Sequence, residues 1–410
     1  MNIQASALTI LLTAFTLMGC RQADVQRLDQ ERLTTELDSL FDRKFPKEDP
    51  GAAVIVTHHD SIVYNRCFGM ARLDTPTPIT GHTMFNICSV SKQFSAVAIL
   101  KLAEEGKLSL DDSLKKFFPE FRADFYNRIT LRHLLSHTSG LPDARPRTAE
   151  QWQRYTSTTP TRFTCVEDFK RFCEEDESCR YLEQLDTLEF EPGTQYAYQN
   201  PTFQLLLMVI ERVTGQQFDD WMKQHIFLPA GMEQTTFFEP DKVIPDMAHG
   251  YEPVGFTTLN GDRIPTDNPN HYFRSKDGRW EENDYGEASF FGTKADGGIY
   301  TTPLEFLKWD RALYHDQIIS KATRQIAHTA HISTDIPETD YGLAFFIEHK
   351  AQRPTKIYHT GDNGGFLIFE GRIPSLDLFY LVFANRPDWN REATIEAMDQ
   401  IILRAFKPKK

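Results

Sequence analysis

The run Ala52-Ala53-Val54-Ile55-Val56-Thr57 is followed, after the polar residues 58–61, by a second run of β-branched and aromatic residues at 62–68. Such side chains favour extended backbone, and a short polar stretch between two extended runs is typical of a connection between antiparallel strands. We therefore predict a β-hairpin near the start of the chain.

More strands are predicted at the other end of the chain, in residues 343–348, 356–359, 366–372 and 378–384. A final helix follows them, with Asn390 as its expected N-cap. Ahead of the hairpin, apolar residues recur every three to five positions between Val25 and Phe45, which is the pattern of an amphipathic helix.

The middle of the chain alternates helical stretches with long polar loops. The helices are predicted at residues 94–105, 202–214, 218–225 and 303–314. Because strands at both ends flank this region, we expect an α/β (α+β) fold, with one antiparallel sheet built from both chain ends, flanked by helices, and a mostly helical inserted region. The sheet part is predicted at about residues 45–105 and 295–410, and the helical insert at about 106–294.

The composition excludes some classes of function. Of the 410 residues, 40% are hydrophobic and 25% are charged, which is ordinary for a globular enzyme and unlike a disordered chain. The formal net charge is -13, and no stripe of Lys and Arg is interleaved with aromatic residues. We therefore expect no nucleic-acid partner.

The N-terminus predicts export. Residues 3–19 are apolar or small, and Leu17-Met18-Gly19-Cys20 is similar to a lipoprotein signal-peptidase site. We expect a signal peptide at residues 1–19, a catalytic domain at 20–410, and a lipid on Cys20 that holds an exported bacterial lipoprotein on the periplasmic side of the membrane or at the cell surface. An uncleaved anchor is the alternative. Residues 1–19 contain no Lys or Arg, unlike most signal peptides.

Five cysteines remain after Cys20. Three of them share a short segment, which favours one disulfide in an oxidising compartment, with buried free thiols as the alternative. The five are Cys67, Cys88, Cys165, Cys173 and Cys179. Cysteine spacing of the C-x-x-C type is absent, and the pair His133 and His137 lacks the Glu of a zinc-protease helix. We expect no metal and no organic cofactor.

The first chemical motif is Ser89-Val90-Ser91-Lys92, which opens the apolar helix predicted at 94–105. Residues three apart on a helix share a face, so the Lys92 amine can reach the Ser89 hydroxyl. A helix N-terminus also favours the negative charge that forms when a serine attacks. Ser113-Leu114-Lys115-Lys116 has the same spacing, and there we expect a solvated helix edge.

Two further motifs occur once each. Tyr198-Gln199-Asn200 lies on a turn before a helix, where a phenolate beside cations could exchange the serine proton. The alternative is a packed tyrosine and a capping asparagine. His359-Thr360-Gly361 ends an extended run, and its glycine would let a substrate backbone lie close to the strand. The alternative is a glycine-rich hairpin turn.

In this order the three motifs resemble the serine β-lactamase and penicillin-binding protein family, in its class C-like branch. The resemblance covers about residues 45–400, since other family-like stretches follow in family order at 134–142, 191–194, 227–232 and 295–302. It implies that Ser89 is the nucleophile and that Lys92 and Tyr198 share the acid and base work. The resemblance also implies that Asn200, His359 and Gly361 contact the substrate, and that Asn200 orients Lys92. The implied oxyanion hole consists of the backbone N–H groups of Ser89 and Asp362.

The resemblance also implies a function. We expect a serine hydrolase acting through an acyl-enzyme, most readily a peptidase on D-Ala-D-Ala or D-amino-acid peptides, with a small peptide, a β-lactam or an ester as substrate. A class C-like β-lactamase, an esterase and a non-catalytic penicillin-binding sensor are the alternatives. His359 stands where lactamases usually have Lys, so we expect its charge, and with it the binding of a substrate carboxylate, to change between pH 5.5 and 8.5.

Overall fold

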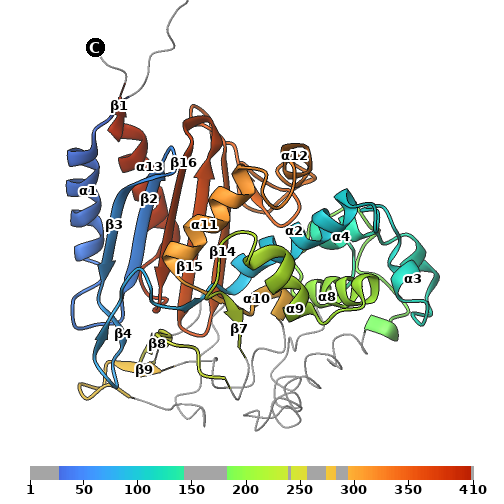
Figure 1. Ribbon diagram of the computed structural model, residues 1–410, viewed down its shortest axis with the longest axis horizontal. Helices are drawn as coiled ribbons and strands as arrows, with labels where there is room; N and C mark the ends of the chain where they lie inside the picture. The colour runs from blue at the N-terminus through green and yellow to red at the C-terminus, as the bar shows by residue number, and fades with distance from the viewer. Residues whose placement is uncertain (1–26, 143–181, 239–241, 256–273, 283–293, 408–410) are drawn as a thin grey trace, which may run out of the picture.

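An eight-stranded antiparallel sheet forms the centre of the molecule (Figure 1). The computed structural model describes residues 27–142, 182–238, 242–255, 274–282 and 294–407. The strands, in sheet order, are β11 (Ile332–Ser333), β12 (Thr339–Tyr341), β13 (Phe346–Glu348), β14 (Lys356–Asn363), β15 (Phe366–Ile373), β16 (Leu378–Ala384), β2 (Ala52–His58) and β3 (Ser61–Phe68). The sheet therefore combines strands from both chain ends, which confirms the predicted fold class.

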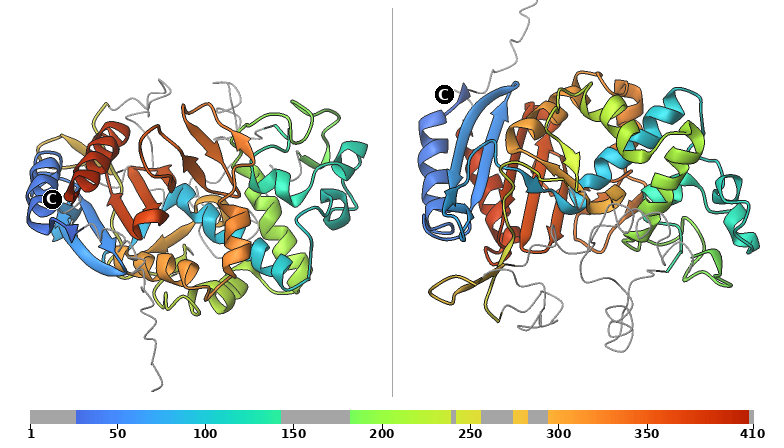
Figure 2. Two further views of the ribbon diagram at one scale, coloured as in Figure 1. Left: turned by 90° about the horizontal axis from the view of Figure 1, so that it is seen from above. Right: turned by 60° about the horizontal axis from the view of Figure 1, so that its bottom comes forward.

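The two chain ends also meet on one face of the sheet. Helices α1 (Gln30–Asp42) and α13 (Arg391–Ala405) lie side by side there (Figure 2). Their apolar stripes, including Leu37 and Ile402, pack with strand residues such as Val54 and Tyr380 into one of the two large hydrophobic clusters. Close by, β1 (Arg27–Leu28) pairs with β17 (Phe406–Lys407).

Helix α2 (Ser91–Glu104) lies against the other face, between the sheet and the helical part of the chain (Figure 1). Most of its residues are buried, because it packs against the sheet, α8 and α10. A helix that is apolar on nearly all sides belongs in the core of a large protein. Helix α11 (Pro303–Tyr314) covers the same face, and its Phe306 packs against Phe379 of β16.

In the region between α2 and α11, helices are the main regular structure of the described residues, and turns and loops make up most of the rest. Its helices are α3 (Leu114–Phe117), η2 (Asp124–Asn127), α4 (Leu131–Leu135), α8 (Pro201–Thr214), α9 (Phe218–Met222), η3 (Lys223–Phe227) and α10 (Lys294–Gly297), and α12 (Lys321–Ala327) follows α11. Short strands β6 (Phe85–Asn86), β10 (Ile299–Thr301) and β7 (Thr236–Phe237) form a small sheet before α2. Two small pairs are β4 (Met70–Arg72) with β5 (Thr77–Pro78) and β8 (Tyr251–Pro253) with β9 (Trp280–Glu282).

Most predicted elements have the expected type, with shifted ends. Strand β14 continues to Asn363, beyond the predicted end at residue 359, because it pairs with β15 along its length. Strand β13 is shorter than predicted, because the chain bends at Leu343 and Ala344, where Ala344 has φ 64°. Asn390 caps α13 as predicted, since its Oδ1 accepts from the Ala393 N–H at 3.2 Å. In the described part of the chain, no helix combines the length and apolar character that crossing a membrane requires.

Candidate functional site

The serine of the first motif lies in a tightly held turn. Ser89 is half-buried in the short helix η1 (Cys88–Val90), which leads directly into α2. Cys88 has φ 50°, a backbone conformation that non-glycine residues rarely adopt and that often marks functional sites. Asn86 fixes this turn, because its Oδ1 accepts from the Cys88 N–H at 2.9 Å and its Nδ2 donates to the Gly297 carbonyl at 3.1 Å.

Lys92 points at the serine as the helical spacing predicts. Its Nζ donates to Ser89 Oγ at 3.2 Å and to the Asp296 carbonyl at 2.9 Å. The lysine is 0% exposed, so its charge and hydrogen bonds act in a site from which water is largely excluded. A buried amine that touches a half-buried hydroxyl is the arrangement that activates a serine nucleophile.

Tyr198 lies beside this pair. Its ring centroid is 5.0 Å from Lys92 Nζ, and one of its faces contacts the His137 ring at 4.3 Å between centroids. His137 also holds the Tyr198 segment through its backbone and side chain, because its carbonyl accepts from the Ala197 N–H at 2.9 Å and its Nδ1 accepts from the Gln199 N–H at 3.1 Å. Burial and the neighbouring Lys92 hold the pKa of His137 well below its usual range, so the imidazole stays neutral and can accept.

Asn200 lies directly before α8, two residues after Tyr198. It occupies the N-cap position of α8, but its side chain makes no capping hydrogen bond. Among the described residues its buried Oδ1 has no hydrogen-bond partner, and the polar contacts of Lys92 go to Ser89 and Asp296 instead. A buried acceptor without a hydrogen-bond donor costs folding free energy, and a substrate N–H could supply that donor.

His359 lies on β14 near Tyr198, with 6.4 Å between the ring centroids. Its Nδ1 lies 2.7 Å from the Thr360 carbonyl and must donate to it, so its Nε2 accepts from the Tyr341 hydroxyl at 3.2 Å. Burial, together with the nearby charge of Lys92, lowers the pKa of His359 to about 3. The expected change of charge between pH 5.5 and 8.5 is therefore wrong, because the buried ring stays neutral across that range.

Gly361 lies where β14 approaches the turn that carries Ser89. A Cβ at this position would lie 2.5 Å from the Ile87 carbonyl oxygen and 2.9 Å from Cys88 Cβ. The glycine thus lets β14 pack directly against the turn that carries Ser89. The next residue, Asp362, is exposed on β14, so the two predicted oxyanion donors belong to neighbouring elements.

The sequence reasoning missed two residues of this site. Asp296 contributes its carbonyl to Lys92 and also places its carboxylate Oδ2 3.8 Å from Lys92 Nζ. His137 supports the segment of Tyr198, although in the sequence it was considered only as a metal ligand. Both residues lie in stretches that resemble the family, 134–142 and 295–302. This resemblance was the only sequence feature that pointed to them.

Only some of the predictions about the cysteines and about the second Ser-x-x-Lys motif concern residues that the structure describes. Cys20, Cys165, Cys173 and Cys179 lie outside the described residues, whereas Cys67 and Cys88 are free thiols. Burial raises the pKa of the Cys88 thiol well above its usual range, so this neighbour of Ser89 is a poor nucleophile. At the rival motif, Lys116 pairs with Asp112 on the surface, as a solvated helix edge does.

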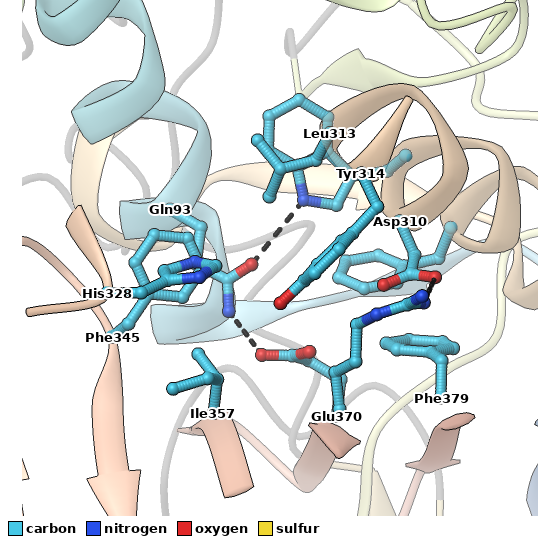
Figure 3. Close-up of a pocket in the computed structure, with 12 residues that line it drawn as sticks. Gln93, Asp310, Leu313, Tyr314, His328, Phe345, Ile357, Glu370 and Phe379 are labelled. Atoms are coloured by element: carbon cyan, nitrogen blue, oxygen red, sulfur yellow. Dashed lines mark hydrogen bonds and ion pairs between the residues drawn. The ribbon is translucent and has the colours of Figure 1, made fainter. Parts of the chain in front are cut away.

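A second polar cluster lies between α2, α11 and β15 and lines a cavity of about 20 Å³ (Figure 3). Gln93, the residue after Lys92, donates to Glu370 of β15. Asp310 pairs with Arg372 in the same cluster. Burial raises the pKa of Glu370 to about 8 and that of Asp310 to about 7. The cluster therefore connects α2 and α11 to β15 through buried polar contacts that include two acidic side chains.

Comparisons of sequence cover most of the chain. A family model described as Beta-lactamase matches residues 41–403. Penicillin-binding protein 4* of Bacillus subtilis strain 168 is 27% identical over 336 residues, which are 80% of this chain and 67% of that protein. D-aminopeptidase of Brucella anthropi is 33% identical over 223 residues, which are 54% of this chain and 39% of that protein. The chain thus spans about two thirds of the first relative and about two fifths of the second.

Solved structures show the same architecture. The octameric penicillin-binding protein homologue from Pyrococcus abyssi is 25% identical, with a TM-score of 0.69 over 93% of this chain and 79% of that chain. The D-amino acid amidase from Ochrobactrum anthropi SV3 is 21% identical, with a TM-score of 0.68 over 92% of this chain and 98% of that chain. The second likeness shows the fold alone.

Proposed function

Because the chain belongs to the beta-lactamase family, we propose that it is a serine hydrolase that forms an acyl-enzyme on Ser89 and acts on D-amino-acid peptides or amides. One observation carries the proposal. The fully buried Lys92 donates to the half-buried Ser89 hydroxyl at 3.2 Å, beside the ring of Tyr198. A protein that only bound its ligand would have no need to bury an amine against a hydroxyl.

In the proposed reaction, Ser89 Oγ attacks the carbonyl carbon of the substrate while the Lys92 and Tyr198 pair takes its proton. The carbonyl oxygen gains the negative charge, and the backbone N–H groups of Ser89 and Asp362 stabilise it. The same pair returns the proton to the leaving nitrogen, which leaves an ester on Ser89. Water then repeats the sequence and releases the acid.

The choice of substrate rests on the relatives and on the polar groups of the site. Relatives include a penicillin-binding protein and a D-aminopeptidase. The unpartnered Oδ1 of Asn200 suits an amide N–H, which a peptide has and a simple ester lacks. We therefore rank a peptidase or amidase first, and a class C-like β-lactamase or an esterase second.

We also propose that the mature protein begins at Cys20, carries a lipid there and works on the periplasmic side of the membrane or at the cell surface. The support is the sequence Leu17-Met18-Gly19-Cys20 after an apolar stretch. Fragments of the cell wall that contain D-amino acids occur in this location, which agrees with the proposed substrate class.

The test uses a fluorescent penicillin and intact-protein mass spectrometry. Wild type should gain one covalent adduct, Ser89→Ala should gain none while staying folded, and Ser113→Ala should behave as wild type. The rate at which the label leaves separates a lactamase from a slow peptidase. Label that persists on Ser89→Ala would overturn the assignment, and turnover of a D-alanine anilide against a matched ester then ranks the substrate classes.

A further inference from the structure

Helix α10 presents three consecutive carbonyl groups to the segment that carries the proposed nucleophile. Each of them accepts a hydrogen bond from a different side chain. Ser95 Oγ donates to Ala295 at 2.6 Å, Lys92 Nζ to Asp296 at 2.9 Å and Asn86 Nδ2 to Gly297 at 3.1 Å. Because the last four carbonyls of an α-helix have no partner within the helix, a helix of four residues depends on donors from outside. Side chains of residues 86–95 supply them here.

The three donor side chains are buried. Asn86, Lys92 and Ser95 are each at most 1% exposed. Ser95 follows Lys92 by three positions, so both side chains leave α2 on the same face. A buried carbonyl that lost its donor would have no water to replace it, and such a loss is costly. The hydrogen bonds on either side of Asp296 therefore hold α10 against α2.

We propose that Ser95 is a positioning residue, which holds α10 so that the Asp296 carbonyl directs the Lys92 amine toward Ser89. The proposal rests on the function proposed above. Lys92 Nζ donates both to Ser89 Oγ at 3.2 Å and to the Asp296 carbonyl at 2.9 Å. Since lysine has a flexible four-carbon side chain, the carbonyl gives its amine a fixed second contact. A shift of α10 would move that contact and the amine with it.

The effect of Ser95 on the reaction passes through the backbone of α10. Its hydroxyl donates to Ala295, the residue directly before Asp296. One turn earlier on α2, Ser91 Oγ accepts from the Ile299 N–H at 3.2 Å. The two hydroxyls thus bind the segment 295–299 at both of its ends, and Lys92 contacts it between them.

Ser95→Ala removes the donor with little change of shape. Thr394→Val is the matched control, because Thr394 is also buried and its hydroxyl donates to the Trp389 carbonyl at 2.9 Å, on the other face of the sheet. The measurement is covalent labelling of the full-length protein by a fluorescent penicillin, with the maximal rate, the concentration that gives half of it, and the final number of labels per chain.

We expect Ser95→Ala to lower the maximal rate by about 10- to 100-fold, since a misplacement of about 1 Å can cost about 100-fold. The half-maximal concentration should stay close to that of wild type, because Ser95 acts on the reacting groups and not on ligand binding. The final labelling should still reach one per chain, and Thr394→Val should follow wild type. Ser95→Cys keeps a weaker donor and should give an intermediate rate, which provides a second variant if the alanine destabilises the fold.

Combining Ser95→Ala with Lys92→Ala separates positioning from a general loss of stability. If Ser95 acts through the amine, its removal should slow labelling no further once Lys92 is absent. Losses that multiply in the double variant would overturn the proposal. So would a Ser95→Ala rate equal to that of Thr394→Val, or fewer labels per chain at an unchanged rate. Label that persists on Ser89→Ala would instead refute the proposed function.

Discussion

His359 shows how burial changes the chemistry that a residue type suggests. As a histidine it was expected to gain charge below neutral pH, but both of its ring nitrogens are hydrogen-bonded and its pKa is lowered to about 3. A neutral ring cannot attract a carboxylate by charge. Arg391, which donates to the Gly361 carbonyl at 3.1 Å, is a cation close by.

We therefore predict parallel pH profiles for a substrate with a free carboxylate and for its uncharged ester. Between pH 5.5 and 8.5, their ratio of kcat/KM should stay constant, because His359 has no proton to lose in that range. The same assay on His359→Gln should give the same flat ratio. A ratio that falls as the pH rises through about 6.5 would mean that His359 is charged at low pH and binds the carboxylate.

The sequence predicted the contact between Ser89 and Lys92 because helical geometry dictates it over three positions. It did not reveal the contact between Lys92 and the Asp296 carbonyl, whose residues lie 204 positions apart. Backbone carbonyls are also the same in every residue, so no side-chain pattern marks them. The burial that sets the charge of His359 is likewise a property of the folded molecule.

At the scale of elements, the contact between β14 and η1 places the strand beside Ser89, the proposed nucleophile. Gly361 makes it possible, because any side chain there would meet the backbone of Ile87. Gly297 of α10 lies near the same turn, yet a Cβ there would be 3.8 Å from its nearest neighbour, the carbonyl carbon of Cys88. Gly297 therefore serves as a control for Gly361, because it lies near the same turn but has room for a Cβ.

Gly361→Ala should lower kcat/KM by about 100-fold, because a shift of about 1 Å at the nucleophile has an effect of that size. It should also cost about 1–3 kcal/mol of unfolding free energy, as overpacked sites do. Gly297→Ala should retain most of the activity and stability. Acylation kinetics and chemical unfolding of both variants check this, and equal effects of the two substitutions would contradict it.

Element type was predictable here, and element length was not. The β-branched and aromatic residues of 356–359 identified a strand, but its continuation through Gly361 to Asn363 depends on pairing with β15. Glycine and asparagine disfavour strands by themselves. The partner strand overrides that preference, and a single sequence does not display the pairing.

At the scale of the whole molecule, the buried acids behind α2 link stability to pH. Glu370 has a usual pKa of 4.5 and a pKa of about 8 in the folded protein. The folded state therefore binds more protons than the unfolded state between these values, and stability falls as the pH rises through that window. Below pH 4.5 both states hold the proton, so this contribution is then fully present.

Glu370→Gln should remove this dependence while keeping an acceptor for Gln93. Relative to wild type, the variant should gain stability between pH 5 and pH 8, and one pKa unit corresponds to about 1.4 kcal/mol. The measurement is the unfolding free energy at both pH values. Glu396→Gln is the control, because Arg353 lowers the pKa of Glu396 to about 2 and no gain is expected there. An unchanged difference between Glu370→Gln and wild type at the two pH values would show that Glu370 is ionised in the folded protein.

The division into strands at both ends and helices between them was predicted from the sequence, because side-chain pattern sets strand and helix preference locally. The order of strands within the sheet was not predicted. The strand order depends on which apolar faces of the helices and strands pack together. Helices α1 and α13, for example, cover the same face of the sheet.

The pairing of β2 with β16 also has a consequence for how the chain is made. Val54 lies opposite Val382, so one of the first strands to leave the ribosome pairs with one of the last. Until residues 378–384 have been synthesised, the hairpin lacks the neighbour that joins it to the rest of the sheet. Contacts between such distant residues make folding slow. The nascent protein therefore stays incompletely folded until residues 378–384 have been made, and a truncation before β16 should leave no folded protein.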